Sequence, residues 1–392
     1  MMKALMISLF PSLGLAVISP EVDCVREADE EDSGFEDLGN FGVLDSFLSG
    51  VQRVDLDFDS LHAGDVSVWR SRLNYRQEHE KWNIEASVGH NDISVDYSDP
   101  VGLTDPTLRD ANSWSGSLTL GKSFSEDLLG TIGFSAYNGY NDYASVWIAE
   151  YYDQFIGIPD PANYQEPNPH GYSINGGFVW DYDPGVARLS FLVSFGNDVV
   201  VPAWSLVPNP DNFFIPEAVS TRSSFDTYSA SAIWVKALNP RLRTQVSWRF
   251  LDVTELEPRY QIQNDWAWAL NDRLTLRAQV GRATQTPEFD AHYGGVSLSY
   301  EINANWSVGL SARIYNDTGE VVPEGFNTAA PAVHSKEMSG SVAWKNLNTT
   351  VRLSAGVYNV GYDALPGDNQ FFGNLYRDRE FTLARLAISH SF

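Results

Sequence analysis

The chain has 392 residues, enough for one large barrel or roughly two to three ordinary domains. It carries 26 Lys and Arg against 51 Asp and Glu, and the formal net charge of -25 argues against nucleic acid and anionic membrane surfaces as partners, because both repel an acidic protein. Its single cysteine, Cys24, excludes an internal disulfide framework, and the lack of a long apolar run after the N-terminus excludes helical membrane spans.

Residues 1–19 have the pattern of a secretory signal peptide. Lys3 supplies the positive start, the stretch from Ala4 to Ile18 is apolar, and Gly14-Leu15-Ala16 offers a small-x-small cleavage site, with the exact cut left open. Cys24 raises the alternative of a lipoprotein, but the preceding residues 21–23 do not form a lipobox.

Residues 20–49 are predicted to form an acidic periplasmic lead-in. Phe35, Leu38, Phe41, Leu44 and Phe47 recur every three residues, which suits a short amphipathic helix. Such a helix could lie in a loosely packed lead-in or could plug the mouth of the domain that follows.

Residues 50–392 show apolar and polar side chains in strict alternation, in segments of about ten to fourteen residues. In the first segment Val54, Leu56 and Phe58 alternate with Arg53 and Asp55. This period of two predicts β-strands with one apolar face. The segment around residues 225–235 is ambiguous, because Phe225, Ile233 and Val235 lie on one face and Tyr228 and Trp234 on the other.

The connections between these segments alternate in length. Short turns rich in Asn, Asp, Pro and Gly fall at residues 77–81, 125–127, 181–185, 237–240, 270–272, 303–305 and 345–348. Longer links fall at about residues 98–111, 144–170, 201–220, 317–333 and 363–376. Short periplasmic turns and long extracellular loops are typical of outer-membrane barrels. The pattern predicts an all-β fold: an antiparallel up-and-down transmembrane β-barrel of about sixteen strands, with both termini on one side.

A soluble all-β sandwich or propeller would also alternate, with its apolar faces turned inward. Three features favour the membrane barrel: the signal peptide, one continuous run of hairpins, and Trp and Tyr near strand ends, where an aromatic girdle would lie.

The last stretch, Arg377 to Phe392, is an amphipathic strand that stops on an aromatic residue. It resembles the C-terminus of bacterial outer-membrane β-barrels, in which the final strand ends at the periplasmic rim and closes against the first strand. Strand count and loop position also resemble the general porins. This resemblance implies the outer membrane of a Gram-negative-type bacterium, contact with its lipid, and a homotrimer.

If the apolar faces meet lipid, the opposite faces line the interior. The predicted pore-lining residues are Arg53, Arg70, Arg72, Arg243, Arg249, Arg277, Arg313, Arg352, Arg385, Asp55 and Glu85. Charges of this kind are costly in a dry core, so they imply either water or close ion pairing. The two interpretations are a water-filled pore and an interior closed by Arg–carboxylate networks.

The longest connection, Ala144 to His170, lies between the fifth and sixth predicted strands. In the general porins that loop folds inward and narrows the channel. The resemblance makes Glu150, Asp153 and Asp160 candidates for a constriction opposite the arginines. The alternative is an outward surface loop with solvated carboxylates.

Catalytic chemistry finds little support. The 7 histidines have no metal-type spacing, and the chain has no glycine-rich phosphate loop. We therefore assign no catalytic residue, no metal and no cofactor. The sequence predicts a passive porin for small hydrophilic solutes or ions, with a non-conducting structural or ligand-binding barrel as the alternative. An active transporter is disfavoured, because too few residues precede the barrel to form a plug domain.

Overall fold

In the computed structural model, the structure describes residues 52–79, 81–97, 107–140, 142–144, 146–147, 150, 169–183, 186–207, 217–254, 257–286, 289–319, 331–363 and 375–392. For residues 198–207, 217–223 and 225 it describes the backbone alone. The predicted signal peptide (1–19) and lead-in (20–49), with Cys24, lie outside the described residues and stay predictions.

Alternating side chains form sixteen strands, as the sequence predicts. Their bounds are β1 Gln52–Ala63, β2 Val66–Glu78, β3 Trp82–Tyr97, β4 Thr107–Ser123, β5 Leu128–Asn138, β6 His170–Asp183, β7 Ala187–Val207, β8 Glu217–Asn239, β9 Leu242–Val253, β10 Arg259–Asn271, β11 Leu274–Gln285, β12 Phe289–Asn303, β13 Trp306–Asp317, β14 Val333–Asn346, β15 Thr349–Tyr362 and β16 Arg379–Ser391.

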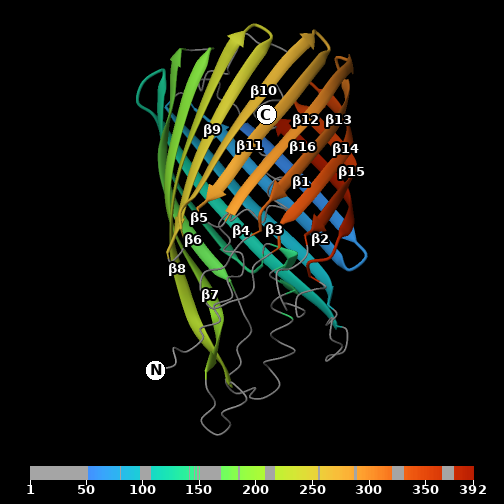
Figure 1. Ribbon diagram of the computed structural model, residues 1–392. Helices are drawn as coiled ribbons and strands as arrows, with labels where there is room; N and C mark the ends of the chain where they lie inside the picture. Colours follow the sequence, from blue (N-terminus) through green and yellow to red (C-terminus); the bar gives the residue numbers. More distant parts are fainter. Residues whose placement is uncertain are drawn as a thin grey trace.

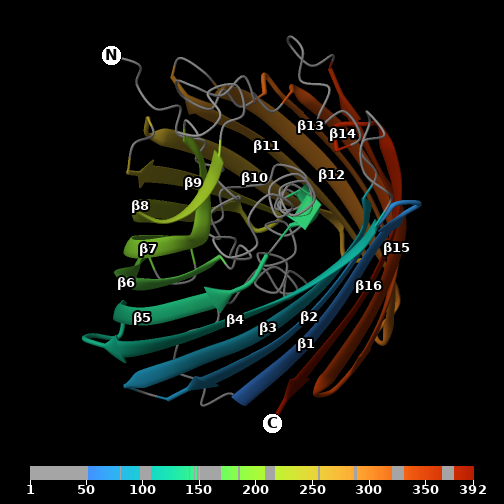
Figure 2. The same ribbon diagram turned by 90° about the horizontal axis from the view of Figure 1, so that it is seen from below.

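The strands form one closed antiparallel barrel (Figures 1 and 2). Each strand pairs with its neighbour in the chain, and β16 closes the ring against β1, with Arg53 opposite Ser391 and Leu61 opposite Leu383. The Phe392 amide donates to the Gln52 carbonyl at 2.9 Å, so both ends of the barrel domain lie at one rim. The predicted closing strand is thereby confirmed.

The two ends of the barrel differ. The end that holds Phe392 carries the short connections after β2, β4 and each later even strand, and we call it the turn end. The opposite end, the loop end, carries the long connections and the β1–β2 turn at Gly64 and Asp65. In Figure 1 the turn end is at the top and the β7–β8 pair extends downward past the other strands.

The turn end is built by one repeated local device. Asn239, Asn271 and Asn303 each accept, through the side-chain oxygen, a hydrogen bond from the backbone N–H two residues later, at 2.8, 2.9 and 2.8 Å. Asparagine favours such turns because its side chain mimics a backbone carbonyl. Each of these turns has one irregularity in the strand pairing, and it lies on the strand that leads into the turn.

The outer surface is apolar. Large side chains exposed on it recur at alternate positions around the ring, among them Trp69 (60% exposed), Trp114 (58%), Ile132 (60%) and Leu310 (68%). An apolar exterior around a charged interior is the arrangement of a barrel that spans a lipid bilayer, so the chain is an outer-membrane β-barrel. None of the helical residues that the structure describes belongs to a helix long and apolar enough to cross a membrane.

Two details of the sequence analysis change. The predicted links at residues 98–111 and 201–220 are too long, because β4 already begins at Thr107, β7 continues to Val207 and β8 begins at Glu217. The ambiguous face of β8 also resolves: Tyr228 is 50% exposed on the outside, whereas Val235 is buried on the inside. Trp234 points outward and donates to the hydroxyl of Tyr182 at 2.6 Å.

Candidate functional site

The inner face of the barrel carries many charged side chains, and several of them are arranged in pairs. Arg53 donates to Asp55 at 2.8 Å, and Arg385 lies 3.5 Å from Asp59. Arg313 lies 4.0 Å from Glu337 on the neighbouring strand. Pairs of this kind are how a barrel interior accommodates charge away from bulk water.

Every predicted pore-lining residue lies on the inward phase of its strand. Arg70 and Arg72 of β2 are in register with Asp59 and Asp57 of β1. Arg249 interacts electrostatically with Asp265. The structure gathers four of the predicted arginines on one cavity in the interior wall: Arg277, Arg313, Arg352 and Arg385.

Water reaches the lumen at the turn end. Arg76 and Glu85 face inward across β2 and β3, 3.3 Å apart, and their side chains are 45% and 48% exposed. Arg76 also pairs with Glu78. Charged side chains with this exposure keep hydration, so the inner wall near the turn-end rim at β2 and β3 is polar and open to water.

Hydroxyl groups fill the inward positions between the charges. Ser87 of β3 and Ser117 of β4 are 2.7 Å apart, and Ser135 of β5 and Ser173 of β6 are 2.6 Å apart. The register joins these pairs into one row across four strands, because Ser117 lies opposite Ser135. A second region of inward serines lies on β12–β15, around the cavity described above.

The loop end of the interior is different, because its inward side chains are apolar. We call the group of buried side chains there the loop-end cluster. Its strand members come from β1–β4 and β11–β16: Leu61, Ala63, Val66, Val68, Ile93, Val95, Tyr97, Ala111, Ala283, Phe289, Ala291, Tyr315, Val333, Tyr358, Val360, Phe381 and Leu383. Apolar side chains inside a membrane barrel need a packing partner, and the β5–β6 connection supplies one.

The first part of that connection lies inside the barrel, as Figure 2 shows for the short helical piece within the ring of strands. Its described residues are 142–144, 146–147 and 150. Trp147 is 1% exposed, with its ring centroid 5.5 Å from that of the inward Tyr97. Val146 is fully buried in the same cluster.

The carboxylate of Glu150 is buried and bonded to β4. It accepts a hydrogen bond from the Thr107 hydroxyl at 2.7 Å and one from Arg109 at 3.2 Å. Glu150 was predicted to face the lumen arginines, and the arginine that it meets was not among them. The other two candidates for the constriction, Asp153 and Asp160, lie outside the described residues.

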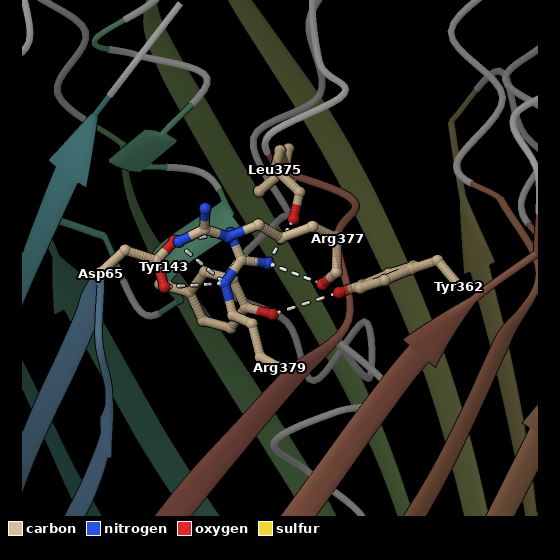
Figure 3. A network of polar contacts seen from close by, with 6 residues as sticks. All are labelled: Asp65, Tyr143, Tyr362, Leu375, Arg377 and Arg379. Carbon is tan, nitrogen blue, oxygen red and sulfur yellow. Dashed lines mark hydrogen bonds and ion pairs between the residues drawn. The ribbon is translucent and has the colours of Figure 1, made fainter. Parts of the chain in front are cut away.

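An ion pair closes the loop-end cluster across the β1–β16 seam (Figure 3). Arg379, at the start of β16, donates from Nη2 to Asp65 Oδ2 at 2.9 Å, and Arg377 reaches the same oxygen at 2.7 Å. The side chains of Arg379 and Asp65 are 2% and 8% exposed. The guanidinium carbon of Arg379 also lies 5.7 Å from the ring centroid of Tyr143 and 5.5 Å from that of Trp147.

The pairing with Arg379 and Arg377 keeps Asp65, in the β1–β2 turn, ionised. Burial alone raises the pKa of Asp65, but hydrogen bonds and positive charge from Arg379, and then from Arg377, outweigh it and hold the pKa below the ordinary value. Beside it, the hydroxyls of Tyr143 and Tyr362 are 3.2 Å apart, which ties the inward segment to β15. Asp65 is therefore a carboxylate at neutral pH and joins the β1–β2 turn to Arg379, which in turn contacts the inward segment.

Sequence reasoning missed Asp65, Arg379 and the apolar part of the interior. The sequence does contain a sign of the apolar region, because the inward-facing positions of β1 change from polar to apolar: Asp57 and Asp59 are followed by Leu61 and Ala63. The same change occurs on β3, from Asn91 to Ile93. The inward face of every strand was predicted to be polar along its whole length, so the change from polar to apolar side chains was not predicted.

No protein-family model and no curated protein matches the chain. Among solved structures, CdiB from Acinetobacter baumannii is similar with a TM-score of 0.52 and 9% identity, over 88% of this chain and 60% of that chain. This chain thus spans about 60% of the length of CdiB. The chain is also similar to a bacterial polysaccharide outer membrane secretin, with a TM-score of 0.47 and 9% identity over 88% of this chain and 99% of that chain. For the Pseudomonas putida toluene transporter TodX the TM-score is 0.43 and the identity 8%, over 88% of this chain and 90% of that chain. At such identities the likeness to CdiB shows the fold, a bacterial outer-membrane β-barrel, and nothing finer.

Proposed function

We propose that the protein is a passive outer-membrane channel for small hydrophilic solutes. The observation that carries this proposal is the exposure of inward-facing charged side chains, Arg76 and Glu85, at the turn end of the lumen. A sixteen-stranded barrel is wide enough to leave an aqueous channel. Size and the charges of the interior would then select the solute, without a cofactor or a catalytic step.

The arrangement of the loop end supports a path beside the inward segment. All strand members of the loop-end cluster come from β1–β4 and β11–β16. On the facing arc, the inward residues at this height include the polar Ser173, Thr227, Arg259 and Gln261 and the apolar Val253, of which Thr227, Gln261 and Val253 are buried. A solute that crosses the loop end would follow this more polar side.

The loop-end cluster also favours a second candidate, a barrel that does not conduct. Val146 and Trp147 belong to one buried cluster with side chains from ten strands, and an apolar barrier of this kind can exclude water and ions. In that case the barrel would be a structural or ligand-binding protein. The homotrimer implied by the resemblance to general porins stays a prediction under either candidate.

Single-channel recording of the purified protein in a planar bilayer separates the two candidates. Stepwise current through the unmodified protein supports the channel. Silence of the unmodified protein, with current appearing only when the loop-end cluster is disrupted by Trp147→Ala, supports the closed barrel. A barrel that inserts and stays silent in both forms contradicts the channel proposal.

A further inference from the structure

A cavity of about 180 Å³ lies in the interior wall formed by β10–β16. Its inward lining contains Arg277, Arg313, Arg352 and Arg385 against one carboxylate, Asp265. A cavity of this size has room for several waters or for a small oxyanion with part of its hydration shell.

Electrostatics within the cavity favour a bound anion. Arg277 of β11 and Arg352 of β15 are close enough to repel each other, and burial removes much of the hydration of Arg277. Arg313 lies 4.0 Å from Glu337, and Arg385 lies 3.5 Å from Asp59. Neither of these two carboxylates is among the residues that line the cavity. An anion between Arg277 and Arg352 would relieve their repulsion.

Hydroxyl donors complete the cavity. Ser297, Ser311 and Ser339 lie in register on β12, β13 and β14, and the hydroxyls of Ser311 and Ser339 are 2.6 Å apart. Ser354 lies in register with Arg385. Guanidinium groups bind carboxylate and phosphate oxygens in bidentate fashion, and serine hydroxyls donate to the oxygens that remain.

We propose that this cavity is a binding site for small oxyanionic solutes, those that carry a phosphate or carboxylate group, and that it gives the channel a preference for anions. The proposal rests on the proposed channel for its transport role, whereas binding itself does not require conduction. The site would hold an anion loosely on the way through, as conduction requires, because a site that binds too tightly blocks its own path.

The binding test uses the full chain in detergent micelles and inorganic phosphate as the probe. Arg277→Gln combined with Arg352→Gln should weaken phosphate binding, measured by calorimetry, at least tenfold. The matched control is Arg282→Gln, which changes an arginine on the same strand but on the outer face, and should leave the affinity within twofold. Equal binding by the double variant and the unmodified barrel would overturn the site. If the double variant does not fold, the unmodified protein alone tests the site. Phosphate should raise the thermal unfolding midpoint of the barrel more than a salt of equal ionic strength that contains no oxyanion, and an equal rise with both salts would overturn the site.

The transport test measures the reversal potential in a salt gradient, before and after the same substitutions. Anion preference that falls in the double variant, while conductance persists, supports both the site and the channel. Phosphate binding without any current keeps the site and contradicts the channel. Current with no phosphate binding and no anion preference keeps the channel and refutes the site.

Discussion

Asp65→Asn is the substitution that tests most directly how the loop end is held. The carboxylate of Asp65 is 8% exposed and faces the guanidinium of Arg379, which is 2% exposed. Removing one partner of a buried pair costs about 3–5 kcal/mol, because the other charge stays buried without compensation. Arg379 keeps hydrogen bonds to the carbonyl oxygens of Leu375 and Arg377, so we expect a loss near the lower limit, about 3 kcal/mol.

The assay is denaturant unfolding of the purified barrel, paired with single-channel recording. Asp290→Asn is the matched control, since Asp290 pairs with Arg282 on the outer face in an exposed pair (34% and 58%) and should shift the unfolding midpoint far less. Because Asp65 holds Arg379, which lies against the rings of Tyr143 and Trp147, the variant should also loosen the inward segment and raise the time-averaged current. Equal unfolding midpoints for the two asparagine variants would refute the argument.

The same pair predicts a direction for pH. The pKa of Asp65 lies below its ordinary value in the folded protein, so its contribution to stability is fully present above the unfolded-state pKa, about 3.9, and is lost as pH falls through the lower folded-state pKa. Between pH 5 and 7 the difference in stability between the unmodified protein and Asp65→Asn should stay constant, and below pH 4 it should shrink. A difference that changes between pH 5 and 7 would assign the effect to another group.

Three further predictions follow from packing and turn geometry. Trp147→Ala should raise single-channel current, because loss of a fully buried indole costs about 3–5 kcal/mol of the packing that holds the inward segment; unchanged current would show that this segment does not limit flow. Gly281→Ala should lower stability by about 1–3 kcal/mol, because its Cβ would collide with the ring of Tyr293, whose hydroxyl bonds to Gln261 and Gln263 at 2.7 and 2.9 Å; denaturant unfolding measures this, and a neutral result would contradict the packing. Asn271→Ala should cost about 1 kcal/mol by deleting the bond to the Arg273 amide, and a shift no larger than that of the neighbouring Asp272→Ala would deny the turn its role.

The barrel was predictable because its determinants are local. Alternation at Val54, Leu56 and Phe58 fixes which face of β1 meets lipid, and a shift of one residue would expose the opposite face. Asparagine turns such as that at Asn271 mark where a strand must reverse. Each signal lies within a few residues of the feature that it specifies, so the strand count and the connection of neighbours could be read from the chain.

The contacts inside the lumen depend on distances across the ring, and these are not local. Asp65 and Arg379 are 314 positions apart, and nothing near either residue marks the other as its partner. The gathering of Arg277, Arg352 and Arg385 depends likewise on the register of several successive hairpins. Alternation placed these arginines on the inner face, but only the closed register shows which of them share a cavity and which meet a carboxylate.

Net charge was the least informative property for function, and the reason is where the charges lie. The chain has a formal charge of -25, which by itself would predict repulsion of anionic solutes. A solute inside the lumen is screened from distant loops by water and salt over about 8–10 Å, so it responds to the side chains that line its path. In the cavity on β10–β16 the charged side chains are four arginines and one aspartate. An acidic protein can therefore contain an anion-preferring passage, and the sign of the reversal potential reports the lumen and not the composition.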